Sequence, residues 1–223
     1  MLFGGLDFFD IMVRLIVLLT AMPVHECAHG WVAYKLGDTT AERQGRLTLN
    51  PFHHIDPLGA LSMLLVGFGW AKPVPVNPYY FRSNPRRGMA LTALAGPGSN
   101  LLMALILCLA CKLALVGAMA GAAEEVLAVL AQILLVMAQI NITLAVFNLL
   151  PIYPLDGSRI LGYFLPVRLL QRFEQYQQVI YYVFLGIILF TNILTGPLGY
   201  LSYQVFRGVD WLSSLFGLLP RIF

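Results

Sequence analysis

Charged residues are scarce in this chain. Only 11% of its 223 residues are Asp, Glu, Lys or Arg, whereas 59% are hydrophobic and the mean hydropathy is +0.77. A soluble domain carries about 25% charged residues, so this chain lacks the polar side chains needed to cover a surface facing water. The composition excludes an ordinary soluble domain and indicates an integral membrane protein.

Cysteine and basic charge are also sparse. The three cysteines exclude a disulfide-stapled scaffold, and the C-x-x-C of Cys108 and Cys111 lies in an apolar run, where both are expected to be small buried hydrophobes. The net charge is only +3, and the basic residues lie near expected helix ends, so binding to nucleic acid is not expected.

Long apolar runs with at most one charge occur at residues 101–123, 126–150 and 179–201. Each exceeds the roughly 20 residues that a helix needs to cross a bilayer. They predict an all-α polytopic membrane protein, a helical bundle of about four to six transmembrane helices in a single domain, residues 1–223. Spans are expected at about residues 8–36, 88–116, 124–148 and 175–194, with a further tilted or interfacial helix over 200–223.

Residues 38–87 differ from the rest of the chain because they are rich in proline and glycine. The stretches "RLTL" and "KPVPV" indicate short strands or extended hairpin arms. Between them, Leu58–Gly69 is apolar but too short to span, so a re-entrant or interfacial segment is expected. The sequence therefore predicts a small membrane-associated β or re-entrant region here.

The distribution of Lys and Arg predicts the orientation in the membrane. Seven lie in residues 35–87 and three in residues 159–172, whereas the turn between the second and third spans carries Glu124 and Glu125. The positive-inside rule places both basic regions in the cytoplasm.

The motif H-E-x-x-H carries the expected chemistry. His25 and His29 are four residues apart, on one face of a helix, so both imidazoles can bind one Zn²⁺. Glu26 follows His25 and can serve as the base that activates water. The alternative is a pair of structural histidines, but ionisable groups within a membrane helix are costly and usually functional.

A catalytic zinc site needs a third protein ligand. His53, His54 and Asp56 lie in the irregular loop, and Asp156 follows the third span. Asp156 also fits a turn or N-cap aspartate. His54 could equally support the metal site from behind or be a solvated loop residue. The residues alone leave these alternatives open.

Two motifs resemble the site-2 protease family of intramembrane zinc metalloproteases. "HECAH" combines with "NLLPIYPLDG", which fits the family pattern N-x-x-P-x-x-x-x-D-G, and "ALAGPGSN" resembles its glycine-proline motif. "GRLTLNPFHHIDPLG" and "GFGWAKPVPVNPYYF" resemble the compact bacterial and archaeal branch without a PDZ domain. The similarity runs over residues 13–161.

The resemblance implies roles for individual residues. His25, His29 and Asp156 would bind one Zn²⁺, Glu26 would be the catalytic acid and base, and Asn148 would lie near the substrate or the developing oxyanion. It implies cleavage of membrane-protein or peptide substrates within the lipid bilayer. It also implies a bacterial or archaeal inner membrane, with the active site towards the cytoplasm.

Two other functions compete with proteolysis. A membrane zinc-binding protein or metal transporter should present ligands along a path, and it would not need Glu26. An enzyme acting on a small or lipid substrate should present a closed pocket.

Overall fold

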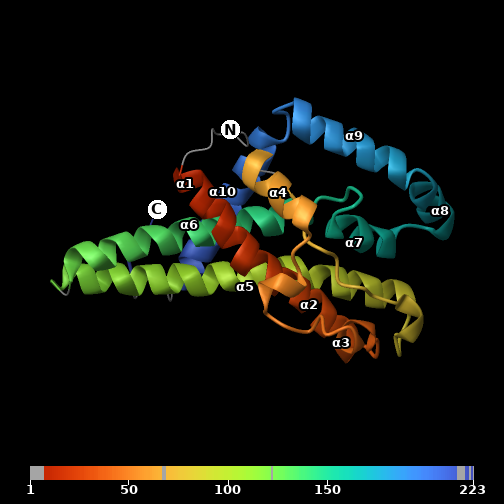
Figure 1. The fold of residues 1–223 in the computed structure, drawn as a ribbon, viewed down its shortest axis with the longest axis horizontal. Helices are drawn as coiled ribbons and strands as arrows, with labels where there is room; N and C mark the ends of the chain where they lie inside the picture. Colours follow the sequence, from red (N-terminus) through yellow and green to blue (C-terminus); the bar gives the residue numbers. More distant parts are fainter. Residues whose placement is uncertain (1–7, 67–68, 122, 215–218, 221, 223) are drawn as a thin grey trace.

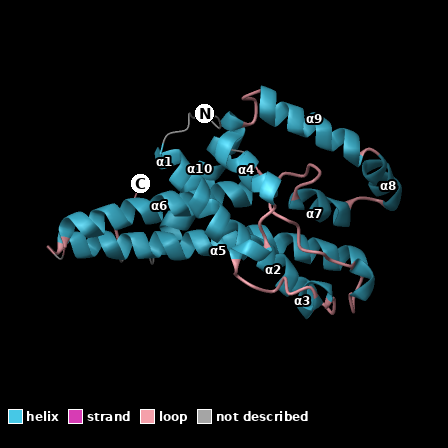
Figure 2. Ribbon diagram, in the orientation of Figure 1, coloured by secondary structure: helices cyan, strands magenta, loops and turns pink. Residues whose placement is uncertain are grey.

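The computed structural model describes residues 8–66, 69–121, 123–214, 219–220 and 222. The described chain is built from helices joined by loops, as Figure 2 shows. The fold is therefore helical, as predicted, and has two parts. An elongated hairpin of two long helices forms one end, and shorter helices gather at the other (Figure 1).

The first membrane helix is continuous from Phe8 to Lys35. It comprises α1 (Phe8–Ile16), a π-helical turn (Val17–Ala21) and α2 (Met22–Lys35). The helix ends one residue before the expected limit of 36, and Gly37 follows with a φ of 113°, in the left-handed region that favours glycine. The residues of the H-E-x-x-H motif consequently lie within regular α-helix.

The long hairpin consists of α5 (Pro85–Met119) and α6 (Glu124–Asn148). At 1.5 Å per residue α5 is roughly 50 Å long, more than enough to cross a bilayer. The two helices pack through small side chains that allow close approach, among them Ala104, Cys108 and Ala138, all fully buried. Cys108 and Cys111 are buried and free of disulfides, as predicted.

The predicted β region is wrong for the residues that the structure describes. Residues 36–84 contain α3 (Thr40–Arg43), α4 (Pro57–Val66) and two short 3₁₀ turns, and the closest approach to a strand is one antiparallel bridge between Ile55 and Ala71. The physical reason is the proline content, because each proline removes an N–H that a ladder requires. The ten-residue α4 is too short to cross a bilayer, as expected.

The C-terminal part contains α7 (Asp156–Phe164), α8 (Val167–Gln175), α9 (Gln177–Phe190) and α10 (Thr195–Ser213). By length and composition, three described helices can span a membrane, and α9 with α10, bent by 90°, makes a possible fourth. The predicted number of four to six spans is therefore not confirmed for the described residues. The bend arises because residues 191–194 interrupt the expected span at its end.

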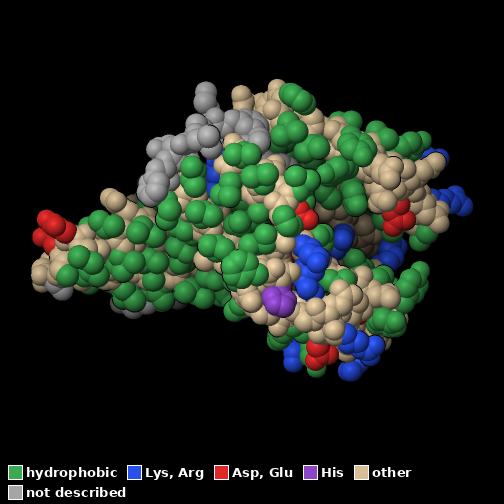
Figure 3. Space-filling model, viewed as in Figure 1, with side chains coloured by type: hydrophobic (Ala, Val, Ile, Leu, Met, Phe, Trp, Pro, Cys, Tyr) green, Lys and Arg blue, Asp and Glu red, His purple; other side chains and the backbone are tan. Residues whose placement is uncertain are grey.

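Charge is distributed unevenly over the surface. Figure 3 shows hydrophobic side chains over the long hairpin, acidic side chains at its tip, and Lys and Arg gathered at the opposite end. The tip is where Glu124 and Glu125 begin α6, and both are exposed. Acidic side chains also lie at the basic end, and the orientation in the membrane remains a prediction.

Candidate metal centre

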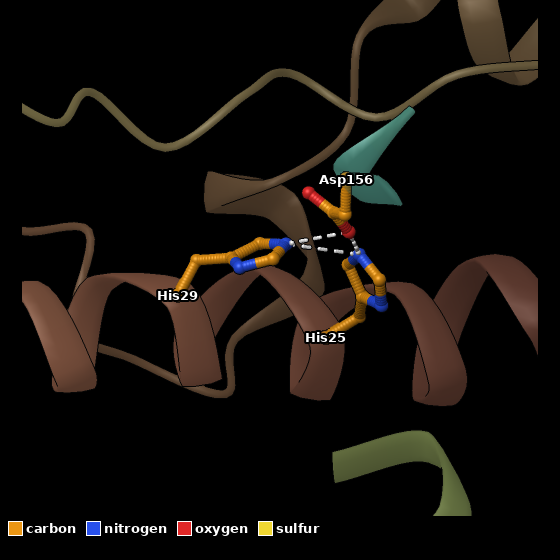
Figure 4. A group of neighbouring side chains, drawn as sticks. All are labelled: His25, His29 and Asp156. Atoms are coloured by element: carbon orange, nitrogen blue, oxygen red, sulfur yellow. Dashed lines mark hydrogen bonds and ion pairs between the residues drawn. The ribbon is translucent and has the colours of Figure 1, made fainter. Parts of the chain in front are cut away.

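Two imidazoles of α2 face one another across one helical turn. The Nε2 atoms of His25 and His29 lie 3.0 Å apart, and both side chains are buried. Figure 4 shows the two rings rising from the same face of the helix. The four-residue spacing therefore places both imidazoles on one face of the helix, as the sequence predicted.

Asp156 completes this group from the first turn of α7. Its Oδ2 atom lies 3.1 Å from His25 Nε2 and 3.2 Å from His29 Nε2 (Figure 4). The N-cap of α7 is Leu155, with no side-chain cap, so the alternative interpretation of Asp156 as a capping residue is wrong. Within the described residues, this trio is the one cluster of three or more His, Cys, Asp or Glu side chains close enough to hold a metal ion.

The second nitrogen of His29 determines its tautomer. Its Nδ1 lies 2.7 Å from the carbonyl oxygen of Thr92 on α5. A carbonyl oxygen can only accept a hydrogen bond, so Nδ1 of His29 carries the proton. The Nε2 atom of His29 therefore presents a lone pair to the centre.

A relay of two amides determines the tautomer of His25. Asn141 donates its Nδ2 to the carbonyl of Met137 at 2.9 Å, which turns its Oδ1 towards Nδ2 of Asn100, 3.0 Å away. Asn100 must then present Oδ1 to Nδ1 of His25, 2.7 Å away. Because Oδ1 only accepts, Nδ1 of His25 carries the proton and its Nε2 is also a lone pair.

The trio fits a divalent cation. Two imidazole lone pairs and a carboxylate oxygen meet within 3.0–3.2 Å with no proton to share between the imidazole nitrogens, and Asp156 Oδ2 is buried without a hydrogen-bond donor. Tetrahedral Zn²⁺ with bonds of 2.0–2.1 Å separates its ligand atoms by about 3.3 Å. The geometry and the donor set therefore suit zinc.

The electrostatics of the group favour an ionised Asp156. Burial alone would raise the pKa of this carboxyl, but His25 and His29 carrying a proton on Nε2 would outweigh burial and hold its pKa well below the usual range. A cation bound between the three groups would supply the same positive charge when Nε2 carries a lone pair. The position of Asp156 in the first turn of α7 adds the favourable field of a helix N-terminus. The carboxylate is consequently in the form that binds metal ions.

Two glycines make room for the centre. A Cβ at Gly96 would lie 2.5 Å from His29 Nε2 and 2.6 Å from His25 Cε1, so the rings pack directly on the backbone of α5. A Cβ at Gly157 would lie 2.2 Å from the carbonyl oxygen of Leu149, which shows how closely α7 approaches the end of α6. Each glycine lies in a motif that the sequence singled out, and each serves close approach.

Glu26 lies on α2 beside the trio and has a partner of its own. Its Oε2 accepts a hydrogen bond from the backbone N–H of Val74 at 3.0 Å. Glu26 is partly exposed and does not belong to the candidate ligand cluster. This position is compatible with the predicted role as a base, which remains a prediction.

The other candidates for a third ligand have different roles. His53 is exposed, and Asp56 accepts from the N–H of Gly59 and so caps α4. His54 is 1% exposed, with Nε2 2.7 Å from the carbonyl oxygen of Thr48, so the interpretation as a solvated loop histidine is wrong. Burial lowers the pKa of the His54 imidazole, despite the bond to Thr48.

Asn148 ends α6 and donates its Nδ2 to the carbonyl of Leu144 at 3.0 Å. One of its two amide hydrogens is used in this way. Its predicted role beside the substrate remains a prediction. Asn141, seven residues earlier, accepts an interhelical hydrogen bond from Asn100.

Thr92 and Gly96 are the functional positions that sequence reasoning did not single out. Thr92 contributes only a carbonyl, which any residue has, so no sequence signal could have found it. Gly96 belongs to the glycine-proline motif, which marked the segment but not its contact with the imidazoles. Asn100, the last residue of the same motif, orients a candidate ligand.

A cavity of about 460 Å³ lies next to α7. Its lining includes Tyr153 and Ser158, on either side of Asp156 in the sequence, together with Arg86 of α5 and Phe173 of α8. None of the three candidate ligands lines it. We therefore assign metal binding to the buried trio and not to this cavity.

Comparison with known proteins agrees with this assignment. Residues 13–191 match the family described as Peptidase family M50. The relatives YwhC of Bacillus subtilis and Rip2 of Mycobacterium tuberculosis, each described as "Putative zinc metalloprotease", share 40% and 29% identity with the chain. Each similarity extends over 209 residues, which are 90% of this chain and 89% of YwhC, and 92% of this chain and 74% of Rip2. No solved structure matches the chain. A peptidase family match over most of the sequence, on a fold that joins the H-E-x-x-H helix to the aspartate of the D-G motif, shows that this chain belongs to peptidase family M50.

Proposed function

We propose that this protein is an intramembrane zinc metalloendopeptidase that cleaves peptide bonds within or near transmembrane segments of other membrane proteins. The observation that carries the proposal is the convergence within 3.2 Å of Asp156 with His25 and His29, which lie on a helix long and apolar enough to span a membrane. A metal centre at that position makes chemical sense if the bond to be cut is also in the membrane.

The ligands and their partners prepare the site. His25 and His29 keep their Nδ1 protons on fixed acceptors, so both Nε2 atoms and Asp156 Oδ2 would hold the metal without rearrangement. Zinc bound there supplies a Lewis acid that makes water nucleophilic near neutral pH and polarises a carbonyl. The protein contributes the geometry before the substrate arrives.

Glu26 would move the protons of the reaction. Its carboxylate takes a proton from the attacking water and later gives it to the amine that leaves the cleaved peptide bond. Asn148, with one amide hydrogen uncommitted to Leu144, would bind the substrate or the developing oxyanion. A helical substrate hides its carbonyls in internal hydrogen bonds and must unwind locally before attack.

The location we propose is a bacterial inner membrane, with the metal centre towards the cytoplasm. The basic end of the molecule, opposite the acidic tip of the α5–α6 hairpin, supports this orientation (Figure 3). The bacterial origin of the relatives supports the type of membrane.

A role as a metal transporter is less well supported. The candidate ligands meet at one point, and within the part of the chain that the structure describes no second cluster of this kind continues a path. Transport also gives no role to Glu26, whose carboxylate is held beside the trio but outside it.

The fragments of membrane proteins test the proposal. Cells producing the wild-type protein are compared by mass spectrometry with cells producing Glu26→Gln, which keeps all three ligands, and Glu125→Gln, an exposed control at the hairpin tip. We expect cuts in transmembrane segments with the wild type and Glu125→Gln only. Identical fragment profiles for all three proteins, with zinc bound to each, would contradict proteolysis.

A further inference from the structure

One backbone amide stands alone between two prolines close to the metal centre. In the sequence Lys72-Pro73-Val74-Pro75, the prolines have no N–H, so Val74 carries the single donor of residues 73–75. That donor does not join a strand ladder. It binds Oε2 of Glu26 at 3.0 Å, 48 residues earlier in the chain.

The segment that carries this amide is anchored on both sides of Val74. Before it, the N–H of Lys72 donates to the carbonyl of His54 at 2.8 Å, and Arg46 donates to the carbonyl of Lys72 at 2.6 Å. After it, the N–H of Asn77 donates to Asp38 Oδ2 at 2.6 Å. These anchors hold Val74 in place without help from Glu26.

The anchors are themselves buried. Asp38, Arg46 and His54 are 0%, 6% and 1% exposed. A hydrogen bond out of reach of water is not readily exchanged for one to solvent, so the loss of a partner there is costly. The segment is thus fixed before any substrate binds.

The helix side of the contact is equally close. Gly30 lies one turn beyond Glu26 on α2, and a Cβ there would lie 2.7 Å from Leu47 Cδ2 and 3.2 Å from Val74 Cγ1. Val74 is only 8% exposed. The lack of a side chain at Gly30 therefore lets the segment lie against the helix near the carboxylate.

We propose that the Val74 amide is a positioning group for Glu26 in the peptidase reaction, an inference that rests on the proposed function. The N–H fixes one carboxylate oxygen, so the other oxygen points in one direction as the proton acceptor. Hydrogen bonds to an ionised carboxylate are stronger than neutral ones and constrain its orientation. The two prolines restrict the backbone so that its one donor stays aimed at Glu26.

A positioning role predicts a loss of rate without a loss of zinc or of folding stability, whereas a structural role predicts the loss of all three. The hydrogen bonds of the other anchors and the three candidate ligands do not use the Val74 N–H, so its removal leaves them unchanged. We therefore expect kcat to fall about 10- to 100-fold, the range expected for one hydrogen bond to a charged group. The KM, the zinc content and the unfolding temperature should stay near the wild-type values.

The test removes one N–H from the full-length protein. Valine 74 is replaced by its α-hydroxy acid during cell-free synthesis into liposomes, which converts the amide into an ester and keeps the side chain. The control is the same ester at Val76, which gives a like change of backbone two residues away. Cleavage is followed with a single-span transmembrane peptide that carries a fluorophore and a quencher.

Each outcome decides the proposal. A kcat reduced only by the ester at position 74, with zinc retained, supports it. Equal rates for the two esters, or loss of zinc or of fold with the ester at position 74, would overturn it. A wild-type protein that binds zinc but cuts no peptide would instead overturn the proposed function and this role with it.

Discussion

At the metal centre, each imidazole is oriented by the acceptor on its far nitrogen. Thr92 and the relay from Asn100 to Asn141 fix both Nδ1 protons, so the ligand lone pairs are set by α5 and α6 and not by α2 alone. Partners of this kind hold the ligand rings in place and raise their affinity for metal. At the scale of single residues, the site therefore depends on groups that never touch the metal.

Removal of the relay should weaken metal binding. In Asn100→Ala, His25 loses the acceptor on Nδ1, so its ring can turn or change tautomer, and we expect zinc affinity to fall about 10- to 100-fold. Competition with a chelator of known affinity measures the change. Ser99→Ala, which alters only a bond to the carbonyl of Gly96 in the same helix, should bind zinc as tightly as wild type. Equal affinities of the two variants would disprove the relay.

Gly96 should tolerate no side chain. The added methyl of Gly96→Ala would lie 2.5–2.6 Å from both imidazoles and displace the rings from the positions in which they bind metal. We therefore expect at least about a tenfold loss of zinc affinity. Two residues along the same helix, a Cβ at Gly98 meets nothing within 4 Å, so Gly98→Ala is the matched control. Zinc content after purification distinguishes them. Full zinc occupancy in Gly96→Ala would contradict the packing described.

At the scale of elements, the connection between the first helix and α5 departs most from expectation. Alternation of apolar residues predicted strands, but Pro73 and Pro75 cannot donate to a ladder, and the N–H groups of Val74 and Asn77 donate to the side chains of Glu26 and Asp38. Periodicity reports which side chains are apolar and not where backbone donors go. The helices, in contrast, were predicted closely because long apolar runs and Gly37 mark them directly.

His54 makes this connection sensitive to acid. Burial lowers its pKa, so the folded protein favours the neutral imidazole and the unfolded chain binds the proton more tightly. The stability from His54 is present above the ordinary pKa of about 6.5 and is lost as the pH falls through the lower folded-state pKa. Thermal unfolding from pH 8 to pH 5 should show a steeper acid loss for wild type than for His54→Gln. Parallel curves would contradict this.

At the scale of the whole molecule, a buried ion pair joins the long hairpin to the C-terminal helix. Lys112 Nζ lies 2.8 Å from Asp210 Oδ1, and the side chains are 0% and 3% exposed. The other carboxylate contact, from the N–H of Ile222 to Asp210 Oδ1 at 3.1 Å, draws in the end of the chain. Lys112 therefore faces the interior of the bundle.

Breaking this pair should destabilise the bundle. Lys112→Met leaves Asp210 charged and unpaired, for which we expect a loss of about 3–5 kcal/mol in the free energy of unfolding. Replacing both residues, in Lys112→Met with Asp210→Leu, should recover most of that loss because no charge is then buried alone. Denaturant unfolding in detergent measures both. A double variant no more stable than Lys112→Met would show that the partners contribute independently.

Site residues close together in the sequence could be predicted from spacing, and those far apart could not. His25, Glu26 and His29 lie within five residues of one helix, so local spacing was sufficient to find them. Asp156 is far along the chain, and only the family resemblance selected it over His53, His54 and Asp56. The contacts of Thr92, Gly96 and Val74 depend on helix packing and on backbone atoms, which leave no pattern in side chains.

The central claim is that His25, His29 and Asp156 bind the zinc that makes this protein a peptidase. The most direct test strips the purified protein of metal, reconstitutes it in liposomes with a labelled transmembrane peptide, and titrates zinc back. The account predicts no cleavage without metal, full recovery at one zinc per chain, and no such recovery for Asp156→Asn. Cleavage by the metal-free protein, or equal recovery by Asp156→Asn, would contradict it.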